Sequence, residues 1–385
     1  MTLRIAIVGH IRHPIAPPFK GGMEAFTHAL ARMLAERGHE VTLLASGDSA
    51  TGLPPGVKLL PICDAHYDAR FPWHNFHGTD VLNDHLDACY ARAARLLLDG
   101  RFDVVHNNAL HRFLPRLSRA ERLPMVTSLH IPPFKVLRRA ITDGAAPWHL
   151  PTVVSERQRD IWWPEGAPET AHVVHNGIDL ARWPQGKLGD GSAVWAGRIT
   201  PTKGTHLAAE AAQRAGVPLR IYGIVEHEDY FNDAVKPHLY GAVEYVGHLE
   251  TADLVEAYGR ASVALFTPQW EEPFGLAAVE AMATGLPVAA TPHGAVEEVL
   301  GEAGVIASED TSEALAVALR QALQISAEVP RARVARLFDA RQMVDKFEAL
   351  YRTAHARRRE GAVEKTYPEF ALRVEETRRP TVAAS

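Results

Sequence analysis

Two glutamates, Glu272 and Glu280, stand on either side of the expected start of a helix. The residues that turn the chain into this helix are Pro273, Phe274, Gly275 and Leu276. The first N–H groups of a helix, here those of Gly275 and Leu276, have no intrahelical partner, and the helix dipole adds positive potential. This start therefore suits a diphosphate. Glu280 lies roughly two turns farther on and could accept hydrogen bonds from the vicinal hydroxyls of a sugar.

Two glutamates on one helix are ordinarily a solvated face, and that alternative applies here as well. The surroundings argue against it, because Pro-Phe-Gly and Leu-Ala-Ala-Val between the two carboxylates are apolar. The strand expected next, over 287–291, also reads as buried. We therefore interpret both glutamates as ligand-binding.

A second charged segment, from Gly197 to Gly204, follows an expected strand and opens a helix. It carries Arg198 and Lys203, and a lysine at a helix N-terminus opposes the dipole unless an anion lies beside it. We interpret the pair as a diphosphate clamp that stabilises charge on the leaving group. The alternative is an Arg and a Lys on an ordinary surface loop. The two downstream glutamates favour the clamp.

Near the start of the chain, Gly21, Gly22 and Glu24 precede or open a helix expected over 22–37. Glycines allow a backbone to approach a phosphate closely, so this segment is the expected contact of the first half with donor and acceptor. A double glycine before a helix is by itself a weak signal. The first strand is not followed by G-x-G-x-x-G, which counts against a dehydrogenase.

His130 ends the expected strand 125–129 and is followed by Pro132 and Pro133, which hold the next loop extended. A histidine in this place could hydrogen-bond a sugar hydroxyl or shield a developing oxocarbenium ion. The alternative is a histidine with an internal partner. His106 and His111 are weaker candidates on the acceptor side.

Strand-like runs alternate with helical stretches in both halves, which predicts an α/β protein with two parallel, helix-covered sheets. Ligands of such sheets bind beyond the carboxyl ends of the strands. Strands are expected over 3–8, 40–45, 103–106, 125–129, 152–155 and 172–175, and then over 193–196, 219–222, 243–246, 263–266, 287–290 and 305–307. Further helices are expected over 80–98, 203–215, 274–283, 312–323 and 341–359.

Composition limits the function. A chain of 385 residues exceeds one ordinary core, so two domains are expected, and a formal charge of −5 gives no support for nucleic-acid binding. Cys63 and Cys89 lack metal-ligand spacing, which favours a reducing cytoplasm. The first run, 3–8, reads as a strand and not as a signal peptide, and no stretch is apolar enough for a spanning helix. No metal-binding pattern or cofactor motif is evident.

The chain resembles the glycosyltransferases of family 4, which act on nucleotide-diphosphate sugars, retain anomeric configuration and have the two-Rossmann GT-B architecture. Glu272 and Glu280 match the family's two motif glutamates, and the resemblance extends from Gly21-Gly22-Met-Glu24 to Gly294-Ala-Val-Glu-Glu298. It implies two Rossmann-like domains facing a cleft. The expected parts are an acceptor-binding domain over 1–180, a nucleotide-sugar-binding domain over 181–340, a helix crossing back to the first domain over 341–360, and a mobile tail over 361–385.

The resemblance also implies roles for the residues above. Arg198 and Lys203 match the family's diphosphate-binding pair, Glu280 would bind the ribose, Glu272 the transferred hexose, and His130 would contact that sugar from the first domain. Gly197 lies beside the clamp. The expected activity is metal-independent transfer of a hexose from a UDP-, GDP- or ADP-sugar to a saccharide, lipid or small-molecule hydroxyl.

Two alternatives stay open: a catalytically silent, nucleotide-sugar-binding partner subunit, and a phosphorylase or epimerase on the same fold. Glu271 departs from the smaller residue that the family often has before its first motif glutamate. No base-reading pattern follows Tyr222.

Two surfaces of the first half could set the acceptor. An aromatic loop over 61–79 suits stacking on a sugar or packing on its own side chains. Arg112, Arg116 and Arg119 recur at helical spacing, which is compatible with peripheral contact to anionic lipid or with an ordinary solvated face.

Overall fold

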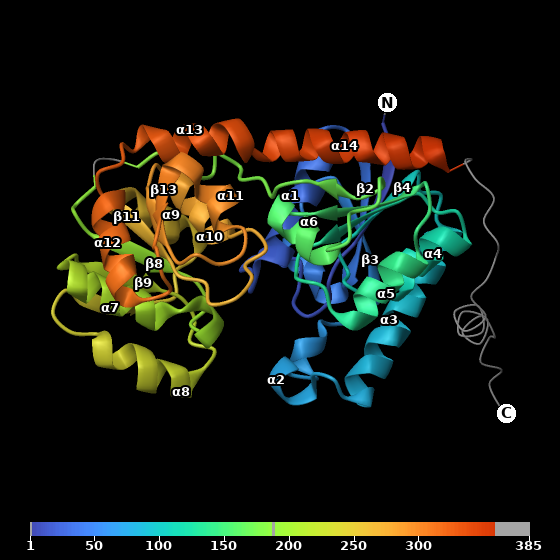
Figure 1. The fold of residues 1–385 in the computed structure, drawn as a ribbon. Coiled ribbons are helices and arrows are strands. Elements are labelled where there is room, and N and C mark those ends of the chain that lie inside the picture. The colour runs from blue at the N-terminus through green and yellow to red at the C-terminus, as the bar shows by residue number, and fades with distance from the viewer. Residues whose placement is uncertain (1, 187–188, 359–385) are drawn as a thin grey trace. The chain divides into compact units, whose positions relative to one another are not determined.

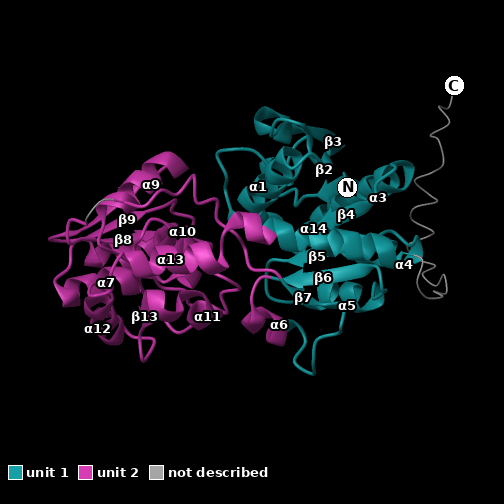
Figure 2. Ribbon diagram, turned by 90° about the horizontal axis from the view of Figure 1, so that it is seen from above, with its two compact units in different colours: residues 1–153, 162–173, 344–385 teal, residues 154–161, 174–343 magenta. Residues whose placement is uncertain are grey.

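The computed structural model describes residues 2–186 and 189–358, and its chain forms two compact units, each built on its own sheet (Figures 1 and 2). Unit 1 consists of Met1–Val153, Trp162–Val173 and the chain from Val344 onward. Unit 2 consists of Val154–Ile161 and Val174–Met343. The tail expected to be mobile, 361–385, lies outside the described residues.

The sheet of unit 1 is parallel, with the order β3-β2-β1-β4-β5-β6-β7. Its strands are β1 (Arg4–Val8), β2 (Glu40–Ser46), β3 (Val57–Cys63), β4 (Val104–Asn107), β5 (Met125–Leu129), β6 (His149–Val153) and β7 (His172–Val173). The helices that precede β7 in the chain are α1 (Gly22–Glu36), α2 (Trp73–Phe76), α3 (Asp80–Asp99), α4 (Phe113–Ala120), α5 (Lys135–Asp143) and α6 (Glu156–Trp162). Of these, α6 belongs mostly to unit 2.

The sheet of unit 2 is also parallel, with the order β10-β9-β8-β11-β12-β13. Its strands are β8 (Ala193–Ala196), β9 (Leu219–Tyr222), β10 (Val243–Gly247), β11 (Val263–Phe266), β12 (Val288–Ala290) and β13 (Gly304–Ile306). Its helices are α7 (Thr205–Ala215), α8 (Glu228–Tyr230), α9 (Thr251–Arg260), α10 (Leu276–Ala283), α11 (Val296–Leu300), α12 (Ser312–Ala322) and α13 (Glu328–Leu337).

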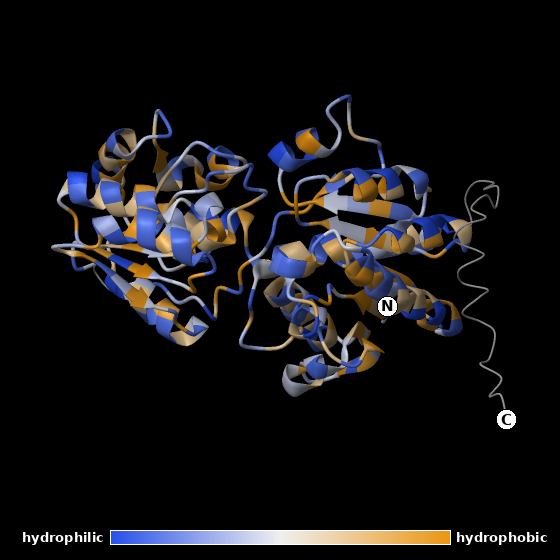
Figure 3. Ribbon diagram, turned by 90° about the horizontal axis from the view of Figure 1, so that it is seen from below, coloured by the Kyte–Doolittle hydropathy of each residue, from blue (hydrophilic) through white to orange (hydrophobic). Residues whose placement is uncertain are grey.

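The alternating pattern of the sequence is confirmed as two parallel, helix-covered sheets. The strands carry mostly hydrophobic residues, while the helices mix hydrophobic and hydrophilic ones (Figure 3). This is expected because the strands of a covered parallel sheet are buried on both faces, whereas the helices are buried on one face. Strand β3 is not among the predicted strands. It contains Pro61, which cannot donate to a ladder and is tolerated because β3 is an edge strand. Strand β6 begins three residues before the predicted 152–155.

Each sheet reverses its strand order once, between β1 and β4 in unit 1 and between β8 and β11 in unit 2. Loops leaving neighbouring strands diverge at such a point, so it is where open α/β sheets bind ligands. In unit 2 the loops after β8 and β11 are those that hold the clamp residues and the first motif glutamate. The topology therefore brings the two charged segments of unit 2 to one place.

The C-terminal helix α14 (Ala340–Arg357) returns to the first unit, as predicted. Its Tyr351 is fully buried, and its hydroxyl lies 2.6 Å from His106 Nδ1 in unit 1. Nearer the start of the helix, Asp345 pairs with Arg37 at 2.5 Å. In the described part of the chain, no helix has both the length and the apolar character needed to cross a bilayer.

Candidate active site

The start of α10 lies at the carboxyl edge of the second sheet, behind the first motif glutamate. The helix begins at Leu276, two residues later than expected, with Gly275 as its N-cap and no capping side chain. The preceding loop is fixed, because Ser155 Oγ donates to the Pro273 carbonyl at 2.7 Å and Phe274 is buried. Within the part of the chain that the structure describes, the first N–H groups of the helix are thus left without a capping side chain and can bind an anion.

Lys203 and Glu272 form an ion pair in front of this helix. Lys203 Nζ lies 2.7 Å from Glu272 Oε2, and Trp270 Nε1 donates to the same oxygen at 2.8 Å. The ammonium also lies 5.5 Å from the centre of the Trp270 ring. A lysine at a helix N-terminus needs an anion beside it, and in this structure the anion is the carboxylate of Glu272.

The loop that carries Lys203 is tied to the end of β11. Thr267 Oγ1 donates to the Lys203 carbonyl at 2.8 Å, and Gln269 N donates to the Thr202 carbonyl at 2.8 Å. Gly204 has φ +61°, and a Cβ there would lie 2.2 Å from the Thr267 carbonyl. Only glycine permits this close approach, so the residue after Lys203 fixes the main chain of this loop relative to the end of β11.

Arg198, the other clamp residue, follows Gly197 at the end of β8 and pairs with Glu226 at 2.9 Å. The pair is accessible to solvent, with 46% of the Arg198 side chain and 24% of the Glu226 side chain exposed. An exposed ion pair of this kind contributes little free energy, so a phosphate can exchange with the carboxylate.

Glu280 lies on α10 and is partly buried. Desolvation alone raises the pKa of Glu280 to about 7, because within the described chain no hydrogen bond or cation stabilises its charge. A desolvated carboxylate of this kind is stabilised by any ligand that donates hydrogen bonds to it.

In unit 1, the structure brings His130 next to helix α1. His130 Nε2 lies 3.3 Å from Asn108 Oδ1, and its ring packs edge-on against Phe26 at 4.5 Å. Asn108 Nδ2 in turn donates to Thr27 Oγ1 at 3.2 Å. Burial lowers the pKa of His130 to about 4, so the ring is neutral near pH 7 and offers a hydrogen-bond donor or acceptor, not a charge.

The first turn of α1 holds the other predicted residues of unit 1. The helix begins at Gly22, and its N-cap is Gly21, which has no side chain to cap it. Glu24 is buried at 4% exposure, and its carboxylate lies near Gly21. The carboxylate of Glu24 is therefore largely enclosed within the first turn of α1.

The two weaker histidine candidates lie in the interior of unit 1 and have partners there. His106 is fully buried, burial lowers its pKa to about 3, and its ring contacts Asn108, Ser128 and Tyr351. His111 is also buried, with Nε2 3.1 Å from Asp87.

The three arginines at the start of α4 and within it make ion pairs and hydrogen bonds inside unit 1. Arg112 pairs with Asp87 at 2.5 Å, Arg116 pairs with Asp143 at 2.8 Å, and Arg119 donates to a backbone carbonyl.

The aromatic loop packs partly on itself: Phe71 lies 5.4 Å from Phe76, and Trp73 lies 4.0 Å from His77, between ring centres.

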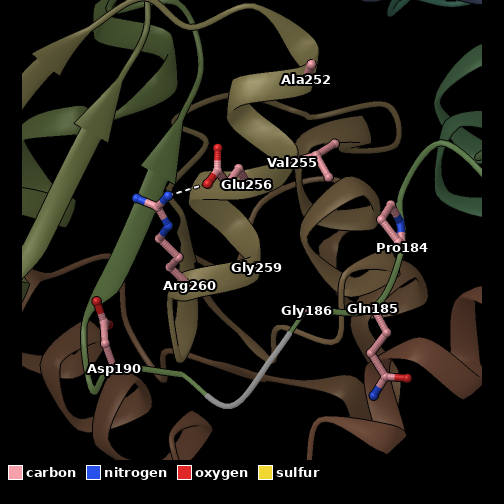
Figure 4. Close-up of a pocket in the computed structure, with 9 residues that line it drawn as sticks. All are labelled: Pro184, Gln185, Gly186, Asp190, Ala252, Val255, Glu256, Gly259 and Arg260. Atoms are coloured by element: carbon pink, nitrogen blue, oxygen red, sulfur yellow. Dashed lines mark hydrogen bonds and ion pairs between the residues drawn. The ribbon is translucent and has the colours of Figure 1, made fainter.

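A cavity of about 690 Å³ lies along α9 and contains none of the predicted residues. It is lined by Pro184, Gln185, Gly186, Asp190, Ala252, Val255, Glu256, Gly259 and Arg260 (Figure 4). Asp190 precedes β8, so this cavity reaches the amino end of the sheet, the end opposite the ligand-binding loops. A second cavity of about 340 Å³ reaches Tyr222, Val246 and Leu249 near the carboxyl ends of β9 and β10.

Three residues of unit 2 acquire a role only from the structure. Trp270 donates to Glu272, Glu226 pairs with Arg198, and Gly294 lies against the backbone of Glu272, where a Cβ would be 2.3 Å from its nitrogen. In the sequence, Trp270 and Gly294 could have been found because they lie in the segments that follow β11 and β12. Nothing in the sequence pairs Glu226 with Arg198.

No group of three or more His, Cys, Asp or Glu residues suited to a metal ion occurs within residues 2–186 and 189–358.

Two family models match this chain in succession. The model described as Glycosyltransferase Family 4 matches residues 20–182, and that described as Glycosyl transferases group 1 matches residues 181–335. The two matches meet where the sequence changes from the first expected domain to the second.

The chain is also similar to individual proteins over most of its length. It is 28% identical to a glycogen synthase of Mycobacterium tuberculosis (strain CDC 1551 / Oshkosh), over 83% of this chain and 87% of that protein. It is 27% identical to a phosphatidyl-myo-inositol mannosyltransferase of Mycolicibacterium smegmatis, over 78% and 80%. Among solved structures, that of Anabaena HepE in complex with UDP and glucose has a TM-score of 0.67 at 18% identity, covering 90% of this chain and 98% of that one. These findings confirm the family resemblance and the GT-B fold.

Proposed function

The chain belongs to family 4 of the glycosyltransferases, which transfer a sugar from a nucleotide-sugar donor, and from this premise we propose that it transfers a hexose with retention of configuration. The proposed donor is a UDP-, GDP- or ADP-hexose. The proposed acceptor is a hydroxyl of a saccharide, a lipid or a small molecule. A cytoplasmic location remains a prediction from the use of cysteine.

The observation that carries this proposal is the Lys203–Glu272 pair in front of the uncapped start of α10, at the point where the second sheet reverses its order. A cation, a carboxylate and free N–H groups meet there. A nucleotide sugar presents the complementary set: an anionic diphosphate next to a sugar rich in hydroxyl groups.

The proposal gives each predicted residue of unit 2 a role in binding the nucleotide sugar. Lys203, Arg198 and the N–H groups of Gly275 and Leu276 bind the diphosphate. Glu280 accepts hydrogen bonds from the ribose hydroxyls, and Glu272 binds a hydroxyl of the hexose. Gly197, Pro273 and Phe274 shape the surrounding loops.

Unit 1 supplies the proposed acceptor side, with His130 as the hydrogen-bonding contact to the transferred sugar. Because the His130 ring is neutral, it can donate to or accept from a hydroxyl without adding charge. Gly21, Gly22 and Glu24 form the other proposed contact of this unit, through the start of α1.

The proposed transfer occurs on one face of the sugar. The bond from the anomeric carbon to the phosphate oxygen breaks, the bond to the acceptor oxygen forms, and the acceptor's proton passes to a phosphate oxygen of the leaving nucleoside diphosphate. Lys203 and Arg198 stabilise the charge that develops on that diphosphate. No protein nucleophile takes part, and charge neutralisation comes from these cations and the start of α10 without a metal ion.

The test is hydrolysis and transfer measured across UDP-, GDP- and ADP-hexoses, for the parent and for Lys203→Ala. Lys236→Ala is the matched control, since Lys236 is an exposed lysine elsewhere in unit 2. We expect one nucleotide series to be turned over by parent and control and lost in Lys203→Ala. Binding of a nucleotide sugar without any turnover would instead support the silent partner subunit.

A further inference from the structure

The carboxylate of Glu272 is held by one of its two oxygens. Its side chain is 9% exposed, and within the described chain the hydrogen bonds to the carboxylate fall on Oε2, from Lys203 and Trp270. Oε1 accepts none of them. The carboxylate therefore has a fixed oxygen and an available one.

The backbone of Glu272 is fixed as well. The N–H of Ala295 donates to the Glu272 carbonyl at 2.9 Å. Gly294, with φ +66°, packs so closely that a Cβ would lie 2.2 Å from the same carbonyl oxygen. With the main chain held by the loop after β12, the direction of the carboxylate depends on Lys203 and Trp270.

These two donors differ in how they respond to a diphosphate. The ammonium of Lys203 is charged and mobile, and a phosphate competes with Glu272 for its three N–H groups. The indole N–H of Trp270 is neutral and belongs to a rigid ring two residues from Glu272, so a phosphate gives it little reason to leave. The same ring lies against the Lys203 ammonium.

We propose that Trp270 is a positioning residue, whose N–H holds Glu272 Oε2 when the donor's diphosphate draws on Lys203, so that Oε1 stays directed at a sugar hydroxyl. This inference rests on the proposed function, in which Glu272 binds the hexose and Lys203 the diphosphate. Trp270 acts through Glu272 and contacts neither reactant in this role.

The experiment is a double-mutant cycle with Trp270→Phe and Glu272→Gln. Phenylalanine keeps an aromatic ring beside Lys203 and removes the N–H, so the fold and nucleotide binding should be kept. A hydrogen bond to a charged group corresponds to a roughly tenfold to hundredfold effect, so we expect kcat to fall by about that factor. Donor KM and the Kd of free nucleoside diphosphate should stay within about twofold of the parent.

The double variant decides whether the effect passes through Glu272. If it does, Trp270→Phe causes no further loss of kcat in the Glu272→Gln background. Independent, multiplicative losses would overturn the proposal, as would a parent-like kcat in Trp270→Phe. Trp183→Phe, at another tryptophan of unit 2, is the control for losing an indole, and its kcat should match the parent.

A different experimental result would contradict the proposed function itself. If Glu272→Gln and Lys203→Ala both leave kcat unchanged, the role of the pair is wrong whatever Trp270 does. Parent-like melting temperatures for Trp270→Phe and Glu272→Gln tie the kinetic changes to positioning. If Trp270→Phe unfolds, loss of nucleotide binding together with kcat would mark the tryptophan as a folding residue and overturn the proposal.

Discussion

Replacing Glu280 by glutamine should stabilise the free protein and weaken its binding of nucleotide. The folded state holds this carboxyl at a pKa of about 7 against an ordinary value of 4.5, and desolvation is the only cause. The raised value means that ionising Glu280 costs free energy in the folded state that it does not cost in the unfolded state. Glutamine has the same shape and carries no charge.

The magnitude follows from the difference between the two pKa values, at about 1.4 kcal/mol for each pH unit. Below pH 4.5 the carboxyl is protonated in both states, and the parent bears no cost. The cost grows as pH rises above this value, to about 2 kcal/mol near pH 6, and levels off at about 3 kcal/mol once pH exceeds 7. The parent therefore loses stability relative to Glu280→Gln as pH rises through the folded pKa.

Thermal unfolding of both proteins near pH 6 and near pH 8 measures this difference. For a unit of this size 1 kcal/mol corresponds to about 2 to 4 °C, so the variant should melt roughly 6 to 12 °C higher near pH 8, with a smaller gain near pH 6. Calorimetry with nucleoside diphosphate should show the opposite sign, with about tenfold weaker binding, because a charged acceptor is lost. A variant that is less stable than the parent near pH 8, or a gain that does not change with pH, would refute the desolvated carboxylate.

Three further outcomes are expected. Lys203→Ala or Arg198→Ala should lower turnover at least about 100-fold, roughly 2.7 kcal/mol of lost leaving-group stabilisation, and unchanged turnover at saturating donor in both would refute the clamp. Glu226→Gln should improve the affinity for nucleoside diphosphate by up to about fivefold, because it frees Arg198 from an exposed ion pair; calorimetry showing weaker binding would argue against this. Activity should survive excess EDTA, whereas complete loss and recovery with one divalent metal would point to Glu271 and Glu272 as overlooked ligands.

Sequence reasoning located the elements well where its signals were local. The strands β8, β9 and β11 were predicted to the residue, because short apolar runs bounded by glycine and polar residues mark buried strands. Strand β3 was missed because Pro61 disqualifies a central strand and the sequence does not say which strand is at the edge. The start of α10 was displaced by two residues, since the cap depends on the backbone of Gly275.

The candidate site also combines features that the sequence predicted with features that only the structure shows. The residue types and their spacing predicted a functional role for Lys203 and Glu272, because they place charged groups at a helix start and after a strand end. That they bind each other, with Trp270 on the same oxygen, could not be predicted, since the pair is separated by 69 positions in the chain. The same applies to Arg198 with Glu226, and to His106, which looked available but is buried.

The sequence by itself determined the two parallel sheets, the family and the set of charged residues, because hydrophobic periodicity, turn residues and motif spacing are local and survive without knowledge of the fold. The tertiary structure alone decided which carboxylate faces which cation and which histidine is buried. It also decided that the motif glutamates differ: Glu272 is hydrogen-bonded, whereas Glu280 is desolvated and has no partner among the described residues. Burial and hydrogen bonding depend on chain segments far apart in sequence, and these set the pKa values and the free energies on which the proposed chemistry depends.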